Sequence, residues 1–154
     1  MLSVGIIGKN GKNIANILGT MAGAHHCYHA TPQQPLTQDT DIIIITDYGS
    51  YQALSPDITH ASYMIINSDD KEIFSILSTS NSATVITYGL NSRACITTSS
   101  MAEGKLQVCI QRSFIDIQGA ECVPQEFSIP LAPGIDNVIE TLAAGAAMSV
   151  CGLI

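Results

Sequence analysis

The sequence predicts an α/β protein with a mainly parallel sheet flanked by helices, of the P-loop or Rossmann-like kind. Strand-like and helix-like segments alternate along residues 2–88, which is typical of a parallel sheet with crossover helices. Residues 91–131 instead carry paired turn signals, which predict an antiparallel β subregion. Residues 134–154 are Ala-rich and predict a C-terminal helix.

A single domain is expected over residues 1–154, with residues 1–90 forming its βαβ part. A chain of 154 residues buries roughly 70% of the surface that it exposes when unfolded. The composition, 46% hydrophobic and 12% charged residues, is that of an ordinary globular protein and argues against disorder.

The first elements follow from apolar patterns. "LSVGIIG" predicts a buried strand, and "KNIANILGTMAG" predicts a helix that ends at Gly23, because its apolar residues recur at helical spacing (Ile14, Ile17, Leu18, Met21). "HHCYHA" predicts a short strand and "TPQQPLTQDT" a loop. The β-branched run "DIIIITD" predicts a strand covered on both faces.

The later elements continue this alternation and then depart from it. "SYQAL" predicts a helical turn, "SYMIINS" a strand, "DKEIFSILST" a helix and "ATVITYG" a strand. After Gly89, turn signals at Glu103-Gly104 and Gln118-Gly119 predict hairpins over residues 93–130. "NVIETLAAGAAMSVCGLI" predicts the closing helix, beginning near Asn137.

Charge and composition exclude several classes of function. A net charge of −7 with only six Lys and Arg argues against binding of nucleic acid or of an anionic membrane. The apolar runs are shorter than the roughly 20 residues that span a bilayer, and no secretory leader is recognised, so a cytoplasmic location is expected. Five cysteines without CxxC spacing predict reduced packing residues.

A glycine-rich turn between the first strand and the first helix is the main candidate site. "GIIGKNGKN" places Gly8, Gly11 and Lys12 where a loop that wraps a nucleotide phosphate has them. The next residue is Asn13, where most such loops carry Ser or Thr. The candidate residues for binding nucleotide or phosphate in this loop are Gly8, Lys9, Asn10, Gly11, Lys12 and Asn13.

Four segments in the same order resemble the central ATP-binding domain of the Mur ligase family, which couples amino acids to UDP-N-acetylmuramate in peptidoglycan synthesis. They are "GIIGKNGKN", "IINSDD", "VITYGLNSRACITTSS" and "LAPGIDNVIETLAAGAAM". The resemblance covers nearly the whole chain, with a gap in the middle portion. It implies ATP and magnesium as cofactors, with Lys12 neutralising phosphate charge and Asn137 placed against the adenine.

Departures from the family pattern point to lost catalysis. Asn13 replaces the Thr that the family uses on magnesium, Lys9 stands where it has Thr, and Asp136 and Glu140 replace its His and second Asn. The residues expected for a second metal are not found in the short middle portion. The two domains that would bind the UDP-sugar and the incoming amino acid have no counterpart in the sequence.

Other motifs have structural explanations that compete with functional ones. Asn137 also fits the cap of the terminal helix, and Asp69 and Asp70 fit a helix N-terminus, where carboxylates are favoured. In the cluster His25-His26-Cys27-His29, alternate side chains share one face of a strand, and thiol and imidazole are ligands for zinc or copper. Three ligands on one strand seldom converge on one ion, so we expect no metal site there.

The sequence supports a non-catalytic, degenerate Mur-ligase-like module with weak or vestigial binding of a nucleotide or phosphate, acting through self-association or a partner protein. The alternative is an ATP-using ligase subunit whose missing domains come from another chain. A third interpretation takes Gly5, Gly8 and Gly11 as a dinucleotide-binding turn, but "HHCYHATPQ" lacks the acidic residue that holds the ribose.

Overall fold

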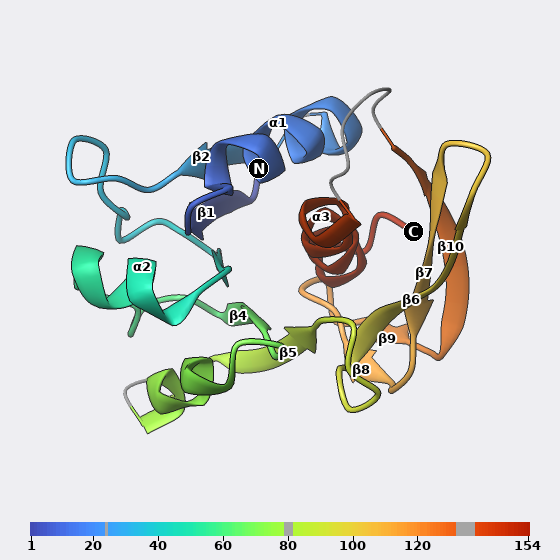
Figure 1. The fold of residues 1–154 in the computed structure, drawn as a ribbon. Coiled ribbons are helices and arrows are strands. Elements are labelled where there is room, and N and C mark those ends of the chain that lie inside the picture. The colour runs from blue at the N-terminus through green and yellow to red at the C-terminus, as the bar shows by residue number, and fades with distance from the viewer. Residues whose placement is uncertain (24, 79–81, 132–137) are drawn as a thin grey trace.

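The computed structural model describes residues 1–23, 25–78, 82–131 and 138–154. Its main feature is an eight-stranded mixed sheet with the strand order β10-β7-β6-β5-β4-β3-β1-β2. The sheet curves around the C-terminal helix, which lies at the centre of the molecule (Figure 1).

Five parallel strands form the first part of the sheet in the order β2-β1-β3-β4-β5. Their bounds are Ser3–Ile7 for β1, His26–His29 for β2, Ile42–Ile45 for β3, Tyr63–Asn67 for β4 and Thr84–Tyr88 for β5. The order reverses after β1, because β2 lies on one side of it and β3 on the other. Such a reversal is the place where ligands bind in doubly wound α/β folds, beside the carboxyl ends of the strands.

The remaining strands are mainly antiparallel. They are β6 (Ile96–Ala102), β7 (Lys105–Ile110) and β10 (Gln125–Pro130), with β8 (Phe114–Ile115) and β9 (Glu121–Cys122) in a separate two-stranded sheet. Strand β6 joins the parallel part through one pair, Tyr88 with Ile96. The turn between β6 and β7 has φ of 55° at Glu103 and 71° at Gly104, as a two-residue type I′ hairpin requires.

Helices cover both faces of the sheet. α1 (Gly11–Ala22) and α3 (Val138–Cys151) pack on one face, and α2 (Tyr48–Leu54) and the 3₁₀-helix η1 (Lys71–Ser78) pack on the other. Alternate residues of β3 supply the two cores, with Ile42 and Ile44 on the α3 face and Ile43 and Ile45 on the other. No helix in the described ranges has the length and apolar character that crossing a membrane takes.

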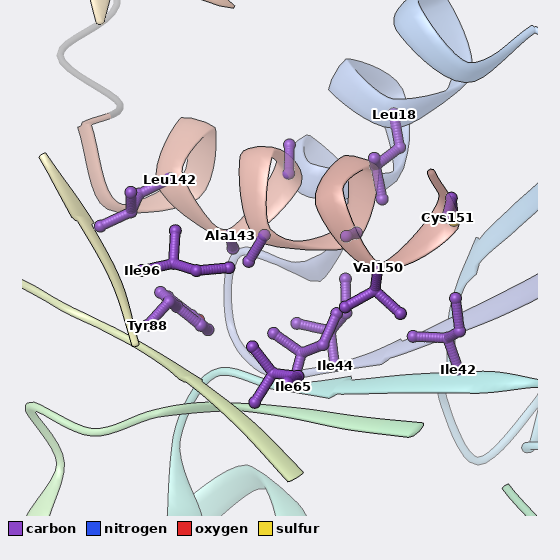
Figure 2. Close-up of a cluster of buried hydrophobic side chains, with 14 of the residues drawn as sticks. Leu18, Ile42, Ile44, Ile65, Tyr88, Ile96, Leu142, Ala143, Val150 and Cys151 are labelled. Carbon is purple, nitrogen blue, oxygen red and sulfur yellow. The ribbon is translucent and has the colours of Figure 1, made fainter. Parts of the chain in front are cut away.

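Helix α3 connects the two parts of the sheet. Its Leu142 and Val150 are fully buried and share one core with Ile44 and Ile65 of the parallel strands (Figure 2). The same core contains Leu106, Val108 and Ile129 of the antiparallel strands. Helix α3 is therefore almost entirely apolar because neighbours surround it on most sides.

The predicted fold class is confirmed: parallel strands with helices, then antiparallel strands, then a C-terminal helix. One element differs in kind, because residues 71–78 form a 3₁₀-helix. Its two buried residues, Ile73 and Ile76, are three apart, which places them on one side of a helix with three residues per turn. The beginning of the predicted C-terminal segment, residues 134–137, lies outside the described residues.

Candidate functional site

The predicted phosphate loop lies at the reversal of strand order. β1 ends at Ile7 and α1 begins at Gly11, so only three residues connect them. Gly8 has φ of 149°, and a Cβ added to it would lie 1.6 Å from Thr46 Oγ1. Glycine is required here because the loop backbone passes directly against the residue that follows β3.

Part of the loop's hydrogen-bonding capacity is used within the protein. The Gly11 N–H donates to the Gly8 carbonyl (3.1 Å), and the Lys9 N–H donates to Asp47 Oδ1 (3.4 Å). Asn10 stands at the N-cap of α1 but makes no side-chain cap. The N–H groups of Lys12 and Asn13, in the first turn of α1, therefore lack a capping side chain, and both side chains are exposed.

A pocket of about 190 Å³ lies behind the loop, at the carboxyl ends of four parallel strands. Thr46 and Asp47 follow β3, Asn67 ends β4, and Tyr88 ends β5. The loop and α1 contribute Lys9, Asn10 and Ile14, and the first turn of α3 contributes Ile139 and Glu140. With two carboxylates and one ammonium, the charged groups of this lining sum to −1.

Asp47 is the most extensively bonded residue of the pocket. Its carboxylate accepts hydrogen bonds from the Ser50 N–H (2.9 Å), the Thr46 hydroxyl (3.0 Å) and the Lys9 N–H. Partial burial raises the pKa of this carboxyl, but the hydrogen bonds together outweigh burial and hold the pKa below its usual value. Asp47 is therefore an anion at neutral pH, with its oxygens fixed in place.

The segment Asn67–Asp70 connects neighbouring loops at this edge. Asn67 Nδ2 donates to the Thr46 carbonyl (3.2 Å), Asp69 accepts from the Leu90 N–H (2.8 Å), and Asp70 accepts from the Tyr48 N–H (2.8 Å). Asp70 also accepts from the Glu72 N–H (3.1 Å) in the first turn of η1. These carboxylates join the loops after β3, β4 and β5, so the helix-start hypothesis describes Asp70 better than Asp69.

Tyr88 lines the pocket, and its hydroxyl oxygen is closed off from solvent. Its side chain is fully buried, lies beside Ile96 under α3 (Figure 2), and its hydroxyl has no hydrogen-bond partner among the described residues. Burial raises the pKa of the phenol, and the nearby charges of Glu140, Asp47 and Asp69 raise it further. The hydroxyl is therefore protonated at neutral pH and lies in a region of negative potential.

Sequence reasoning found one side of this site and missed the other. The six predicted loop residues lie together, but Asn137 lies outside the described residues. Asp47, Tyr88 and Glu140 were not predicted as site residues. A usable signal for two of them is their position directly after a predicted parallel strand or at its end, because such positions meet at one edge of the sheet.

The histidine side chains of the cluster at residues 25–29 make contacts within the protein. His25 Nδ1 accepts from the Leu2 N–H (3.3 Å), the ring of His26 stacks on Tyr28 with centroids 5.1 Å apart, and His29 packs against Gly11. The structure describes all five cysteines, and each is a free thiol. Within the described residues, no three His, Cys, Asp or Glu side chains are grouped to hold a metal ion.

Comparison with models of known protein families gives no match, and no curated protein matches the chain. The Mur ligase resemblance is therefore a hypothesis that rests on the sequence motifs alone.

Proposed function

We propose that the chain is a non-catalytic, degenerate Mur-ligase-like module that binds phosphate, or the phosphate end of a nucleotide, weakly at residues 8–13. The observation that carries this proposal is the start of α1. Two N–H groups of its first turn lack a capping side chain, and the exposed cations Lys9 and Lys12 lie beside them. A helix N-terminus with such neighbours attracts anions through its dipole and its unbonded donors.

Three features support weak binding. The N–H groups of Lys9 and Gly11 already have partners within the protein, which leaves fewer donors for a phosphate. Asp47 and Glu140 line the adjoining pocket and repel an anion. The whole chain, with a charge of −7, repels a nucleotide at long range.

The residues present do not fit a magnesium–ATP complex. The position that supplies a hydroxyl to magnesium in the family is Asn13, and the pocket behind the loop is lined by Asp47 and Glu140, whose negative charges repel a triphosphate. We therefore derive no phosphoryl transfer for this chain. The module would act through self-association or a partner protein, in the cytoplasm, where its free thiols stay reduced.

The test is a calorimetric titration with inorganic phosphate and with ATP, with and without magnesium, at fixed ionic strength. We expect dissociation constants in the millimolar range, which correspond to a binding free energy of about −4 kcal/mol. Lys12→Ala should weaken binding, and Asn13→Thr should strengthen ATP binding only when magnesium is present. Lys105→Ala, which removes an exposed cation on β7, is the matched control. Equal affinities for all four proteins would refute an anion site at the loop.

A second assay separates this proposal from the ligase-subunit alternative. The protein, incubated with ATP, magnesium, UDP-N-acetylmuramoyl substrates and amino acids, should release no phosphate above background and form no ligated product. Phosphoryl transfer needs charge stabilisation and positioning that this loop does not supply. Turnover that Lys12→Ala abolishes would establish the ATP-using alternative.

A further inference from the structure

We propose that a second pocket beside the loop, lined by residues 7–9, residues 29–32 and one side of α2, binds the base of a nucleoside monophosphate. The phosphate of the same ligand binds at residues 8–13, so the inference rests on the anion site proposed above and adds to it the class of ligand. A monophosphate needs no magnesium ion, which agrees with the absence of a hydroxyl at Asn13.

The loop between β1 and α1 has a pocket on each of two sides. The pocket of about 190 Å³ described above includes Ile14 and Ile139, which belong to the core on the α3 face. The second pocket, of about 300 Å³, lies on the opposite face, where the carboxyl ends of β1 and β2 approach α2. The two are called the α3-side pocket and the α2-side pocket below. The larger one lies directly at the reversal of strand order, where ligands bind in doubly wound folds.

Charge distinguishes the two pockets. Lys9 lines both, but Asp47 and Glu140 line only the α3-side pocket. No Asp or Glu is among the described residues that line the α2-side pocket. The group attached to a phosphate at the loop extends to one side or the other, and two carboxylates on the α3 side repel the phosphate that it carries. The α2-side pocket is therefore the one that suits the rest of a phosphate ester.

Two polar side chains at the end of β2 suit a nucleotide. A Cβ added to Gly11 would lie 2.9 Å from His29 Nε2, so this nitrogen lies beside the start of α1, where it can donate a hydrogen bond to a phosphate. The Thr31 hydroxyl accepts from the Gln34 N–H (3.0 Å), and its own proton can be donated to a ribose oxygen. Both His29 and Thr31 line the α2-side pocket.

The remaining side chains of the α2-side pocket are mostly apolar. Ile7 and Ala30 are buried, and Pro32, Ala53 and Leu54 are partly or fully exposed. An uncharged aromatic ring buries apolar surface against such a lining, whereas a second charged group would lose its water without gaining a partner. A base carried on a ribose is a ligand of the first kind.

This placement differs from the one that the Mur ligase resemblance implies. The resemblance puts adenine against Asn137, the residue before α3 in the sequence. The pocket next to the first turn of α3 is the one that Asp47 and Glu140 line. The two placements therefore predict different contacts for the same base.

The first test is a calorimetric titration of the chain with AMP, ribose 5-phosphate and inorganic phosphate at fixed ionic strength. We expect AMP to bind about tenfold more tightly than ribose 5-phosphate, because burial of about 60 Å² of apolar ring surface corresponds to about that factor. Ribose 5-phosphate has the same phosphate and sugar, so the comparison isolates the base. Equal affinities of AMP and ribose 5-phosphate would overturn the inference.

Ala53→Phe tests which pocket holds the base, because it fills the α2-side pocket from an exposed position. It should remove the tenfold advantage of AMP and leave binding of inorganic phosphate unchanged. Gln52→Phe adds the same ring at an exposed position of α2 that lines neither pocket, and it should change neither affinity. Circular dichroism shows whether each variant is folded. An unchanged advantage of AMP in Ala53→Phe would contradict the proposed site.

Amide NMR spectra of the ¹⁵N-labelled chain separate this inference from the anion site. Inorganic phosphate should shift the resonances of Lys12 and its neighbours, and AMP should in addition shift those of Thr31 and Ala53. If both ligands shift only the loop, the base site is wrong and the anion site stands. If AMP shifts Ile139 and Glu140 in place of Thr31 and Ala53, the base lies on the α3 side and the inference is overturned. If no ligand shifts the loop, the anion site itself is refuted.

Discussion

Gly8 determines whether the loop after β1 can lie against β3. Replacement by Ala would place a methyl group 1.6 Å from Thr46 Oγ1 and would force a side chain onto a φ of 149°. Backbone strain of roughly 1–3 kcal/mol adds to overpacking of roughly 1–3 kcal/mol. We therefore expect Gly8→Ala to lower the free energy of unfolding by about 2–5 kcal/mol, measured by urea denaturation.

The same substitution within α1 is the control for this prediction. Gly19 is exposed, and nothing lies within 4 Å of a Cβ added to it. Gly19→Ala should therefore stabilise the protein by about 0.5–1 kcal/mol, because Ala loses less conformational freedom in a helix. Losses of similar size at Gly8 and Gly19 would contradict the close approach of the loop to Thr46.

The buried hydroxyl of Tyr88 should destabilise the unliganded protein. Because its hydroxyl is buried without a partner, Tyr88→Phe should raise the free energy of unfolding of the unliganded protein by about 1 kcal/mol. Tyr63→Phe should lower it by about 1 kcal/mol, since the Tyr63 hydroxyl donates to the Ile115 carbonyl. Thermal or urea unfolding of both variants measures the two signs, and a loss at Tyr88 would mean that its hydroxyl is hydrogen-bonded in solution.

At the scale of elements, Asp47 links α2 to the loop after β1. Its folded-state pKa is lowered, so its contribution to stability is complete above the unfolded pKa of about 3.9 and is lost as pH falls through the folded pKa. We expect Asp47→Asn to be less stable than wild type by about 1 kcal/mol at pH 6 and to approach wild type at pH 3. Urea denaturation at both pH values measures this, and a constant difference would show that the charge of Asp47 contributes nothing.

Most elements could be predicted because their signals are local. The run Ile42–Ile45 has the length and branching of a buried strand, and Glu103-Gly104 has the residues of a tight hairpin turn. The 3₁₀ geometry of residues 71–78 could not be predicted, because Ile73 and Ile76 are also compatible with the spacing of an α-helix. Local patterns therefore predict whether a segment is a helix or a strand better than they predict which kind of helix it forms.

The candidate site was predictable only in the part that is continuous in sequence. Residues 8–13 form a recognisable motif, and the structure keeps them in one turn at the start of α1. Asp47, Tyr88 and Glu140 are separated by about 40 residues or more, and only the strand order brings them into one pocket. That order depends on which strands pair, which no local pattern encodes.

At the scale of the whole molecule, the parallel and antiparallel parts of the sheet share one hydrophobic core, as expected of a single domain. The core on the α3 face contains Ile44 and Ile65 from the parallel strands and Val108 and Ile129 from the antiparallel ones. Within the sheet itself, the described residues of the two parts form one residue pair, Tyr88 with Ile96. Cooperative unfolding of the chain therefore depends on α3, which packs against both parts.

Leu142→Ala tests that dependence. Leu142 is fully buried on α3, so the cavity left by its truncation should cost about 2–5 kcal/mol. If the chain unfolds as one unit, native-state hydrogen exchange should show the same loss of protection for amides of β3 and of β7. Leu153→Ala, at a partly exposed position beyond α3, should change neither. A loss confined to β6, β7 and β10 would show instead that the antiparallel strands unfold independently and that residues 1–154 form two cooperative units.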